Sequence, residues 1–215
     1  MTVCLLSASW FCLGAFGYAV GSIPFGVLFA RLFHLGDLRA IGSGNIGATN
    51  VMRTGHGGAA LLTLLCDALK GFLPVLIAVR LSEGLTDLGM SSPWGAYSVA
   101  LACILGHIFP LWGHFHGGKG LATTAGTLLA LDPQILLVGL ACWLTIFAIT
   151  RISSLSALAS LTGVVLGKGY QIWKGTASLS SMLFMVVLAA LLIWTHRSNI
   201  KRLLAGTEKA LGKAK

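Results

Sequence analysis

A glycine-rich segment at residues 41–53 combines the groups that proteins use to hold oxyanions. It reads Ile-Gly-Ser-Gly-Asn-Ile-Gly-Ala-Thr-Asn-Val-Met-Arg, with hydroxyl and amide side chains between three glycines. Glycines allow tight turns that point backbone N–H groups at one anion, and a guanidinium can hold phosphate oxygens in a bidentate manner. The segment predicts an oxyanion cradle, with a flexible interfacial loop as the alternative. The candidate residues are Gly42, Ser43, Gly44, Asn45, Gly47, Thr49, Asn50 and Arg53.

A second candidate anion site is the turn Gly117-Gly118-Lys119-Gly120, directly before an apolar run. A helix that starts there would add free N–H groups and the positive end of its dipole to the ammonium of the lysine. An ordinary loop whose lysine reaches the membrane surface is the alternative. His107, His114 and His116 lie nearby without a carboxylate or thiolate, so we expect no metal site.

The third cluster is the basic tail at 196–208, which reads HRSNIKRLLAGTE. On a continuing helix, His196 and Asn199 are three residues apart and share a face. An amphipathic helix against anionic lipid explains the basic residues of the tail without any chemistry. It does not explain His196 and Asn199, which stand as candidate site residues.

Three weaker features complete the polar inventory. Asp67 and Lys70 lie inside an apolar stretch, three residues apart, and predict a structural ion pair. The Gly-Ser-Ile-Pro-Phe-Gly sequence at 21–26 interrupts another apolar stretch and predicts a helix break that lines a cavity or receives a neighbouring helix. Arg151 and the nearby Ser154 belong to a short turn between apolar segments.

The elements that hold these clusters are membrane helices by composition. Of 215 residues, 56% are hydrophobic and only 10% are charged, and the mean hydropathy is +0.87. Soluble domains carry about 25% charged residues, so the chain lacks the polar surface that water requires. The five cysteines form no CxxC pair, which argues against a disulfide framework. The net charge of +9 fits a bias toward the inner membrane face better than nucleic-acid binding.

We predict an all-α integral membrane protein with seven spans, formed as a single domain over residues 1–215. The expected spans are 3–33, 57–79, 93–111, 121–131, 133–150, 153–167 and 176–195. The fourth is doubtful, since 11 residues rise only about 16 Å as a helix.

The distribution of basic residues between the two membrane faces distinguishes seven spans from six. With seven spans and an outer N-terminus, 11 basic residues fall inside and 3 outside; without the fourth crossing the counts are 6 and 8. The inner residues are then Arg31, Arg39, Arg53, Lys119, Arg151, Arg197, Lys201, Arg202, Lys209, Lys213 and Lys215, and the outer ones are Arg80, Lys168 and Lys174. The positive-inside rule therefore favours seven spans with the C-terminus in the cytoplasm.

This topology brings every polar cluster to the cytoplasmic face. Two anion cradles beside an apolar bundle suit an enzyme that joins a lipid-soluble donor to a water-soluble phosphorylated acceptor. A transporter or channel for phosphate-like anions is the alternative. The absence of an inverted repeat in the sequence and the lack of polar clusters in the outer loops argue against it.

The chain resembles, from end to end, the acyl-phosphate-dependent glycerol-3-phosphate acyltransferases of bacterial inner membranes. The matching motifs are GSIPFG at 21–26, IGSGNIGATNVMR at 41–53, DALKG at 67–71, GHIFPLW at 106–112, GGKGLATT at 117–124 and HRSNIKRLLAGTE at 196–208. The resemblance implies seven spans and transfer of a fatty acyl group from acyl phosphate to the 1-hydroxyl of glycerol 3-phosphate. It implies no cofactor and no metal, with acyl phosphate, glycerol 3-phosphate and membrane lipid as the partners.

Carried over by motif, the resemblance makes Ser43, Arg53, His196 and Asn199 catalytic residues. It makes 117–120 a glycerol-phosphate-binding turn that contains Lys119, Ser154 a substrate-binding serine, and Glu208 a structural residue. One departure stands out, because His116 occupies a position where the family commonly has lysine. A titratable histidine there replaces the fixed charge of a lysine, so the affinity of the turn for phosphate could depend on pH.

Acyl phosphate is a mixed anhydride with a good leaving group, so no covalent acyl-enzyme is required. We expect Arg53, Lys119 and backbone amides to hold both phosphates and bring the acceptor hydroxyl to the carbonyl. The phosphate of the donor and His196 are competing candidates for the base. Ser43 is disfavoured as a nucleophile, because no base neighbours it in the sequence.

Overall fold

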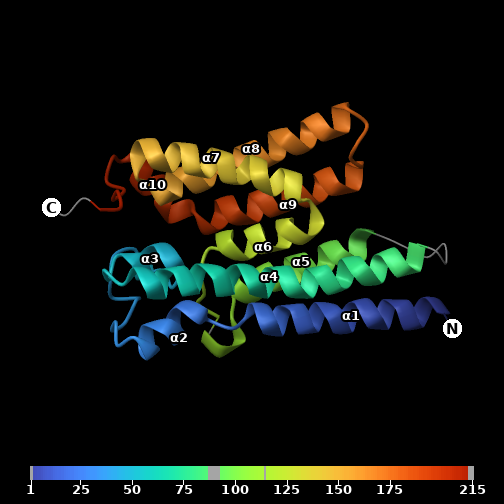
Figure 1. Cartoon of the computed structure of the whole chain (residues 1–215), viewed down its shortest axis with the longest axis horizontal. Helices are drawn as coiled ribbons and strands as arrows, with labels where there is room; N and C mark the ends of the chain where they lie inside the picture. The colour runs from blue at the N-terminus through green and yellow to red at the C-terminus, as the bar shows by residue number, and fades with distance from the viewer. Residues whose placement is uncertain (1, 87–92, 114, 213–215) are drawn as a thin grey trace. The chain divides into compact units, whose positions relative to one another are not determined.

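The computed structural model describes residues 2–86, 93–113 and 115–212, which form helices joined by loops, without a strand in these ranges (Figure 1). The all-α class is confirmed. The elements are α1 (Thr2–Gly21), α2 (Phe25–Leu32), α3 (Ala48–Met52), α4 (Gly57–Thr86), α5 (Pro93–Ile108), the 3₁₀ turn η1 (Leu111–Gly113), α6 (Leu121–Leu131), α7 (Pro133–Thr150), α8 (Ser153–Trp173), α9 (Leu179–Thr195) and α10 (Arg197–Leu204). His114, Lys213 and Lys215, which entered the sequence analysis, lie outside the described residues.

Several helices are long and apolar enough to cross a bilayer. The stretches Ser9–Leu32, Gly57–Leu85 and Pro133–Thr150 meet both conditions, and α9 with α10, bent by 63°, would make a fourth span. Helices α5 and α6 are apolar but shorter, at 16 and 11 residues. Helix α6 thus has the short length that made the fourth span doubtful, and the count of seven spans stays a prediction.

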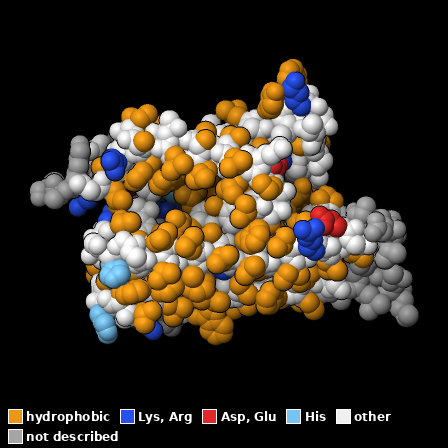
Figure 2. Space-filling model, in the orientation of Figure 1, with side chains coloured by type: hydrophobic (Ala, Val, Ile, Leu, Met, Phe, Trp, Pro, Cys, Tyr) orange, Lys and Arg blue, Asp and Glu red, His pale blue; other side chains and the backbone are white. Residues whose placement is uncertain are grey.

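The surface of α4 shows how the chain meets its surroundings. Leu65, Leu69, Leu73 and Ile77 recur every four residues along it and are each 48–51% exposed. Figure 2 shows apolar side chains over most of the visible surface along this helix. Such a continuous exposed stripe is unfavourable in water and is expected where a helix faces lipid tails.

The chain divides into two compact units, Met1–Leu131 and Asp132–Lys215. In the first unit, α1 packs on α5, and α4 packs on α6. The α4–α6 contact depends on glycine, because a Cβ at Gly126 would overlap the carbonyl of Ala68, and one at Gly71 would overlap the carbonyl of Thr123. Small residues at such a crossing let two membrane helices approach closely.

In the second unit, α7 packs on α8 and α8 on α9. Asp132 caps α7 by accepting the N–H of Ile135 at 3.1 Å, and it also pairs with the buried Lys168 of α8. Phe184, Leu188 and Leu192 recur every four residues on α9 and are at most 2% exposed. The apolar face of α9 and the ion pair between Asp132 and Lys168 hold the three long helices together.

Candidate active site

The 41–53 segment is held in shape by the side chain of Asn50. This side chain is 1% exposed, and its Nδ2 donates to the carbonyl of Leu38 at 2.8 Å and to that of Ile41 at 3.1 Å. Its Oδ1 accepts the backbone N–H of Ser43 at 3.0 Å. Predicted as a ligand-binding donor, Asn50 uses both ends of its amide on the backbone of residues 38–43, so its geometry is that of an internal clamp.

The same amide oxygen brings Ser43 and Arg53 together. Ser43 Oγ donates to Asn50 Oδ1 at 3.4 Å, and Arg53 Nη1 lies 3.5 Å from the same atom. Gly42, at φ +57°, leaves no room for a side chain, because a Cβ there would meet Asn50 Oδ1 and lie 2.8 Å from Arg53 Cδ. The hydroxyl and the guanidinium thus sit side by side at the surface of the segment.

Some of the backbone donors expected to bind an anion are used within the segment itself. The N–H of Gly44 donates to the carbonyl of Ile41 at 2.9 Å, and that of Gly47 to Asn45 Oδ1 at 3.4 Å. The side chain of Thr49 is partly buried. If the segment binds an anion, the side chains of Arg53 and Ser43 are its main candidate donors.

The 117–120 turn is attached to the end of α5 by backbone hydrogen bonds. The N–H of Gly117 donates to the carbonyl of Ile108 at 3.0 Å, and that of Gly118 to the carbonyl of His107 at 3.1 Å. Two of the amides predicted to face phosphate are thereby occupied. They fix the turn instead of binding the anion directly.

Beyond these two amides, the turn leads straight into α6. Gly120 adopts φ +84°, a left-handed conformation that favours glycine, and its carbonyl accepts the N–H of Thr124 at 2.8 Å as the helix begins. Lys119, which directly precedes Gly120 in the turn, is partly buried. Its ammonium is the main cationic group that the turn itself offers to a phosphate.

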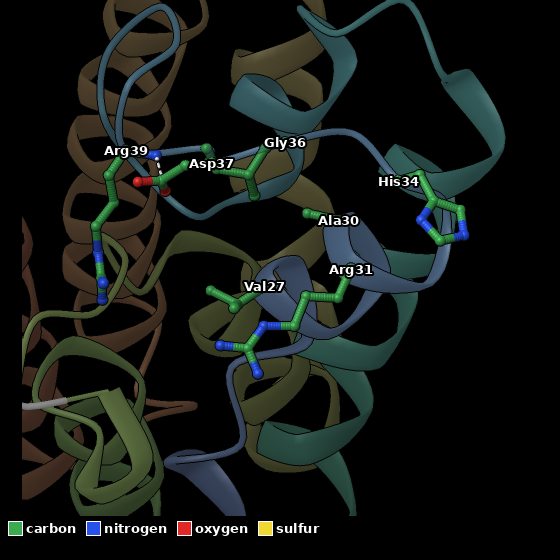
Figure 3. Close-up of a pocket in the computed structure, with 8 residues that line it drawn as sticks. Val27, Ala30, Arg31, His34, Gly36, Asp37 and Arg39 are labelled. Atoms are coloured by element: carbon green, nitrogen blue, oxygen red, sulfur yellow. Dashed lines mark hydrogen bonds between the residues drawn. The ribbon is translucent and has the colours of Figure 1, made fainter.

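A cavity of about 620 Å³ lies in the first unit, between α2 and the chain that leads to the 41–53 segment (Figure 3). It is lined by Val27, Ala30, Arg31, His34, Gly36, Asp37, Leu38 and Arg39. The carboxylate of Asp37 accepts the backbone N–H of Arg39 at 2.9 Å, and Arg39 Nη2 donates to the carbonyl of His116 at 3.1 Å. Arg39 therefore links the approach to the 41–53 segment with the residue that precedes the 117–120 turn.

Sequence reasoning missed Arg31 and Arg39 as site residues and counted them only as topology signals. Figure 3 shows the guanidinium of Arg31 lying across the cavity. With Arg39 also on the cavity wall, two guanidinium groups and one carboxylate, that of Asp37, line the cavity, so its lining carries a net positive charge. Arg31 and Arg39 lie eight residues apart, on either side of the end of α2, and do not form a recognisable sequence motif. Only the fold shows that both line one cavity.

In the second unit, four side chains form what we call the tail cluster: Ser154, Asn199, Arg202 and Glu208. Glu208 Oε1 accepts from Ser154 Oγ at 2.7 Å and from Asn199 Nδ2 at 2.6 Å, and Oε2 accepts from Arg202 Nε at 2.5 Å. The Glu208 side chain is 6% exposed. It joins α8, α10 and the chain after α10, which is the geometry of a structural residue.

Asn199 has an amide oxygen still to satisfy. Its side chain is 2% exposed, and Oδ1 has no hydrogen-bond partner in the described part of the chain. A buried acceptor without a donor is costly, and a bound hydroxyl would satisfy it. Asn199 thus has one end of its amide held by Glu208, while its buried Oδ1 lacks a hydrogen-bond donor in the described residues.

His196 lies at the bend between α9 and α10 and is 2% exposed. Its Nδ1 lies 2.8 Å from the carbonyl of Leu192. Because a carbonyl oxygen only accepts, this contact places a proton on Nδ1 and a lone pair on Nε2 of the neutral ring. That tautomer is the one a histidine base needs if Nε2 is to accept a proton.

The environment of Glu208 favours its charged form. Partial burial acts to raise the pKa of Glu208, but hydrogen bonds from Ser154 and Asn199 and the pairing with Arg202 together outweigh it, so the pKa lies below the ordinary glutamate value. The tail cluster therefore gains stability from an ionised Glu208.

Replacing Glu208 with Gln should lower the melting temperature of the purified protein at neutral pH. With a depressed folded-state pKa, the stabilisation by the carboxylate is present above the unfolded-state pKa of about 4.3 and is lost as pH falls through the folded-state value. The difference in melting temperature between the two proteins should therefore shrink in acid.

Glu83→Gln is the matched control for this measurement. Glu83 pairs with Arg80 at 3.1 Å, but the two side chains are 59% and 73% exposed, so the pair should contribute little. Equal melting temperatures for Glu208→Gln and the unaltered protein at pH 7 would contradict the structural role of Glu208.

In the described residues, no group of three or more histidines, cysteines or carboxylates is arranged to hold a metal ion. The candidate residues instead fall into two sets. The first unit holds the 41–53 segment, the 117–120 turn and the pair Asp67–Lys70, whose Oδ1 and Nζ atoms lie 2.7 Å apart. The second unit holds the tail cluster with His196.

Comparison with known proteins gives a consistent result. The family model described as glycerol-3-phosphate acyltransferase matches residues 11–206. A glycerol-3-phosphate acyltransferase of Methylorubrum extorquens is 50% identical over 212 residues, covering 97% of this chain and 98% of the relative. One of Erythrobacter litoralis is 47% identical over 196 residues, with coverage of 91% and 92%.

Two crystal structures of PlsY, an integral membrane glycerol 3-phosphate acyltransferase, share the fold. The glycerol 3-phosphate form has a TM-score of 0.82 at 38% identity, and the lysophosphatidic acid form has 0.79 at 36%; each covers 95% of this chain and 96% of its own. With the family model over most of the chain and a relative at 50% identity, the chain belongs to the glycerol-3-phosphate acyltransferase family.

Proposed function

We propose that the protein transfers a fatty acyl group from acyl phosphate to the 1-hydroxyl of sn-glycerol 3-phosphate, giving lysophosphatidate and inorganic phosphate. The observation that carries the proposal is the likeness, over almost the whole chain, to a solved acyltransferase described in its glycerol 3-phosphate form. The motifs quoted from the sequence add the acyl-phosphate donor.

The reaction needs two phosphates close together and one acyl carbonyl between them. The acceptor oxygen attacks the carbonyl carbon, a C–O ester bond forms, and the C–O bond to the leaving phosphate breaks. Arg53 with Ser43 holds one phosphate, and Lys119 on the 117–120 turn holds the other. Positioning of this kind can lower a barrier by several kcal/mol, up to about 7–11 in favourable cases.

The hydroxyl proton has two routes. It passes either to the phosphate of the donor, which leaves as a dianion able to accept it, or to Nε2 of His196. Replacing His196 with Gln separates them. Retained turnover removes His196 as the base, and a collapse of turnover with acceptor binding intact supports it. Asn199 and Ser154, which contact Glu208 in the second unit, are the further residues that the proposal assigns to the substrate.

The proposal includes the setting of the reaction. We place the protein in the bacterial inner membrane with seven spans, an outer N-terminus and a cytoplasmic C-terminus, and we take residues 1–215 to act as one catalytic domain. The apolar stripe of α4 and the apolar helices α7 and α9 support a multi-pass protein. The charge count supports the orientation.

The donor test is transfer of label from glycerol 3-phosphate into lipid by the purified protein. Palmitoyl phosphate, palmitoyl-CoA and palmitoyl-acyl carrier protein are offered separately. We expect labelled lysophosphatidate with palmitoyl phosphate only. Equal product with palmitoyl-CoA would contradict the donor, and no product from folded protein with any donor would favour anion transport, to be measured as flux into liposomes.

A further inference from the structure

A buried network of charged and polar side chains extends from the break after α1 to the 117–120 turn. Asp67 and Lys70 of α4 and His107 of α5 are each at most 5% exposed. Lys70 Nζ lies 2.7 Å from Asp67 Oδ1, and the same carboxylate oxygen lies 3.6 Å from His107 Nδ1. Sequence reasoning predicted the ion pair but not its contact with His107.

One end of this buried network lies at the break between α1 and α2. Lys70 Nζ donates to the carbonyl of Ile23 at 2.7 Å and sits 5.7 Å from the centre of the Phe25 ring. Ile23 and Phe25 flank the proline that separates α1 from α2. The ammonium therefore has a partner on each side, one from its own helix and one from the break.

The other end lies against the 117–120 turn. The N–H groups of the turn donate hydrogen bonds to the carbonyls of His107 and Ile108 at the end of α5. The His107 ring occupies the space that a side chain on Gly118 would need. Contact is so close that a Cβ at Gly118 would overlap Nε2 and lie 2.9 Å from Cε1. The ring is thus the surface on which the turn rests.

Stability alone gives a poor reason for this arrangement. A buried ion pair in an apolar bundle is rarely better than well-packed hydrophobic residues, because removing two charges from water costs as much as their attraction returns. His107 Nδ1 adds a buried nitrogen whose 3.6 Å contact with Asp67 Oδ1 is electrostatic and too long for a hydrogen bond. In some proteins, buried polar groups are retained because they fix one local geometry.

We propose that His107 is a positioning residue that sets the 117–120 turn for glycerol 3-phosphate, and that the Asp67–Lys70 pair holds the His107 ring in place. The proposal rests on the proposed function, because it takes 117–120 as the acceptor-binding turn. It assigns a role to a histidine that touches no substrate. The turn also carries Lys119, so a shift of the ring moves the ammonium that holds the phosphate.

The first test separates binding of the acceptor from the rest of catalysis. His107→Ala should raise the KM for glycerol 3-phosphate by about 10-fold or more, with kcat and the KM for acyl phosphate changed by less than about 3-fold. His107→Gln, which restores bulk and a polar end, should recover most of this loss. A His107→Ala enzyme with an unchanged KM for glycerol 3-phosphate would overturn the proposal.

A double-mutant cycle tests the contact itself. Gly118→Ala should raise the KM for glycerol 3-phosphate strongly in the unaltered protein, because its methyl group would collide with the ring. In a His107→Ala background the space is vacant, so the same change should have a much smaller effect. Independent effects of the two changes would contradict a direct contact between ring and turn.

Lys168→Met is the matched control for Lys70→Met. Lys168 forms the other buried lysine–aspartate pair of the described chain, with Asp132, and has no part in the 117–120 turn. Both changes should lower the melting temperature, but only Lys70→Met should raise the KM for glycerol 3-phosphate. Equal KM values for the two variants would reduce the Asp67–Lys70 pair to a purely structural role.

A readout without turnover distinguishes failure of this proposal from failure of the proposed function. The rate of acetylation of Lys119 by acetic anhydride, followed by mass spectrometry, reports the position of the turn whether or not the protein is an acyltransferase. His107→Ala should change this rate, and Lys168→Met should not. An unchanged rate overturns the positioning role even if acyl transfer is observed.

Discussion

Arg53→Ala should reduce kcat/KM for acyl transfer by about 100-fold or more. A charge-assisted contact to a phosphate in a water-poor site is worth about 3 kcal/mol, and each 1.4 kcal/mol is a factor of ten in rate. Arg53→Lys should lose less, because it keeps the charge but not the planar pair of donors. Initial rates of lysophosphatidate formation, with each substrate varied in turn, measure the effect.

Arg80→Ala is the control for that loss. Arg80 is 73% exposed and pairs with Glu83, which is 59% exposed, on the surface of α4. Its removal should leave kcat/KM within about 2-fold of the unaltered enzyme. If Arg53→Ala also retained its activity, the oxyanion role of the 41–53 segment would be wrong.

Gly42→Ala should be nearly as damaging, although it removes no functional group. The added methyl group would meet Asn50 Oδ1 and the Cδ atom of Arg53, and it would also strain a backbone at φ +57°. Relief requires that the Asn50 clamp or the Arg53 side chain moves, so we expect a loss of about 30-fold or more in kcat/KM. Stopped assays on detergent-solubilised protein, normalised to the folded fraction, measure it.

Gly55→Ala separates the collision from the strain. Gly55 adopts φ +88° shortly after Arg53, and a Cβ there would meet nothing within 4 Å. It shares the backbone penalty of about 1 kcal/mol but not the contact. Similar activity losses for the two variants would show that strain alone explains Gly42 and that the packing around Arg53 is unimportant.

The clearest difference between the sequence interpretation and the structure concerns Asn50. Its amide looked like one more donor for an anion, because composition shows which groups a segment contains and not which of them face inward. The structure places this side chain at 1% exposure, bonded to the carbonyls of Leu38 and Ile41 and to the N–H of Ser43. Only the course of the chain from Leu38 to Asn50 reveals that role.

Helix bounds show a similar division between local and distant causes. Helices α6 and α7 begin and end where predicted. The 117–120 turn precedes α6, Asp132 and Pro133 separate it from α7, and α7 ends before Arg151, which has a left-handed backbone. Helix α8 was expected to end at 167, before Lys168, yet it continues to Trp173. Lys168 is buried against Asp132, a partner 36 residues away, so its charge does not end the helix.

His107 was overlooked for the same reason. It was considered only as a metal ligand, without a carboxylate nearby, and as part of a family motif, because a histidine in an apolar run gives no local signal of its contacts. The fold supplies them, with Asp67 on one side and Gly118 on the other. Positioning residues of this kind act through distant neighbours and are therefore the least visible in a sequence.

The most direct test of the central claim is to measure inorganic phosphate and lysophosphatidate in the same reaction. If two phosphates are held together for direct transfer, phosphate should appear only when glycerol 3-phosphate is present, in a ratio of about one to one with lysophosphatidate and without an initial burst. A burst of phosphate from acyl phosphate alone would indicate an acyl-enzyme and contradict direct transfer.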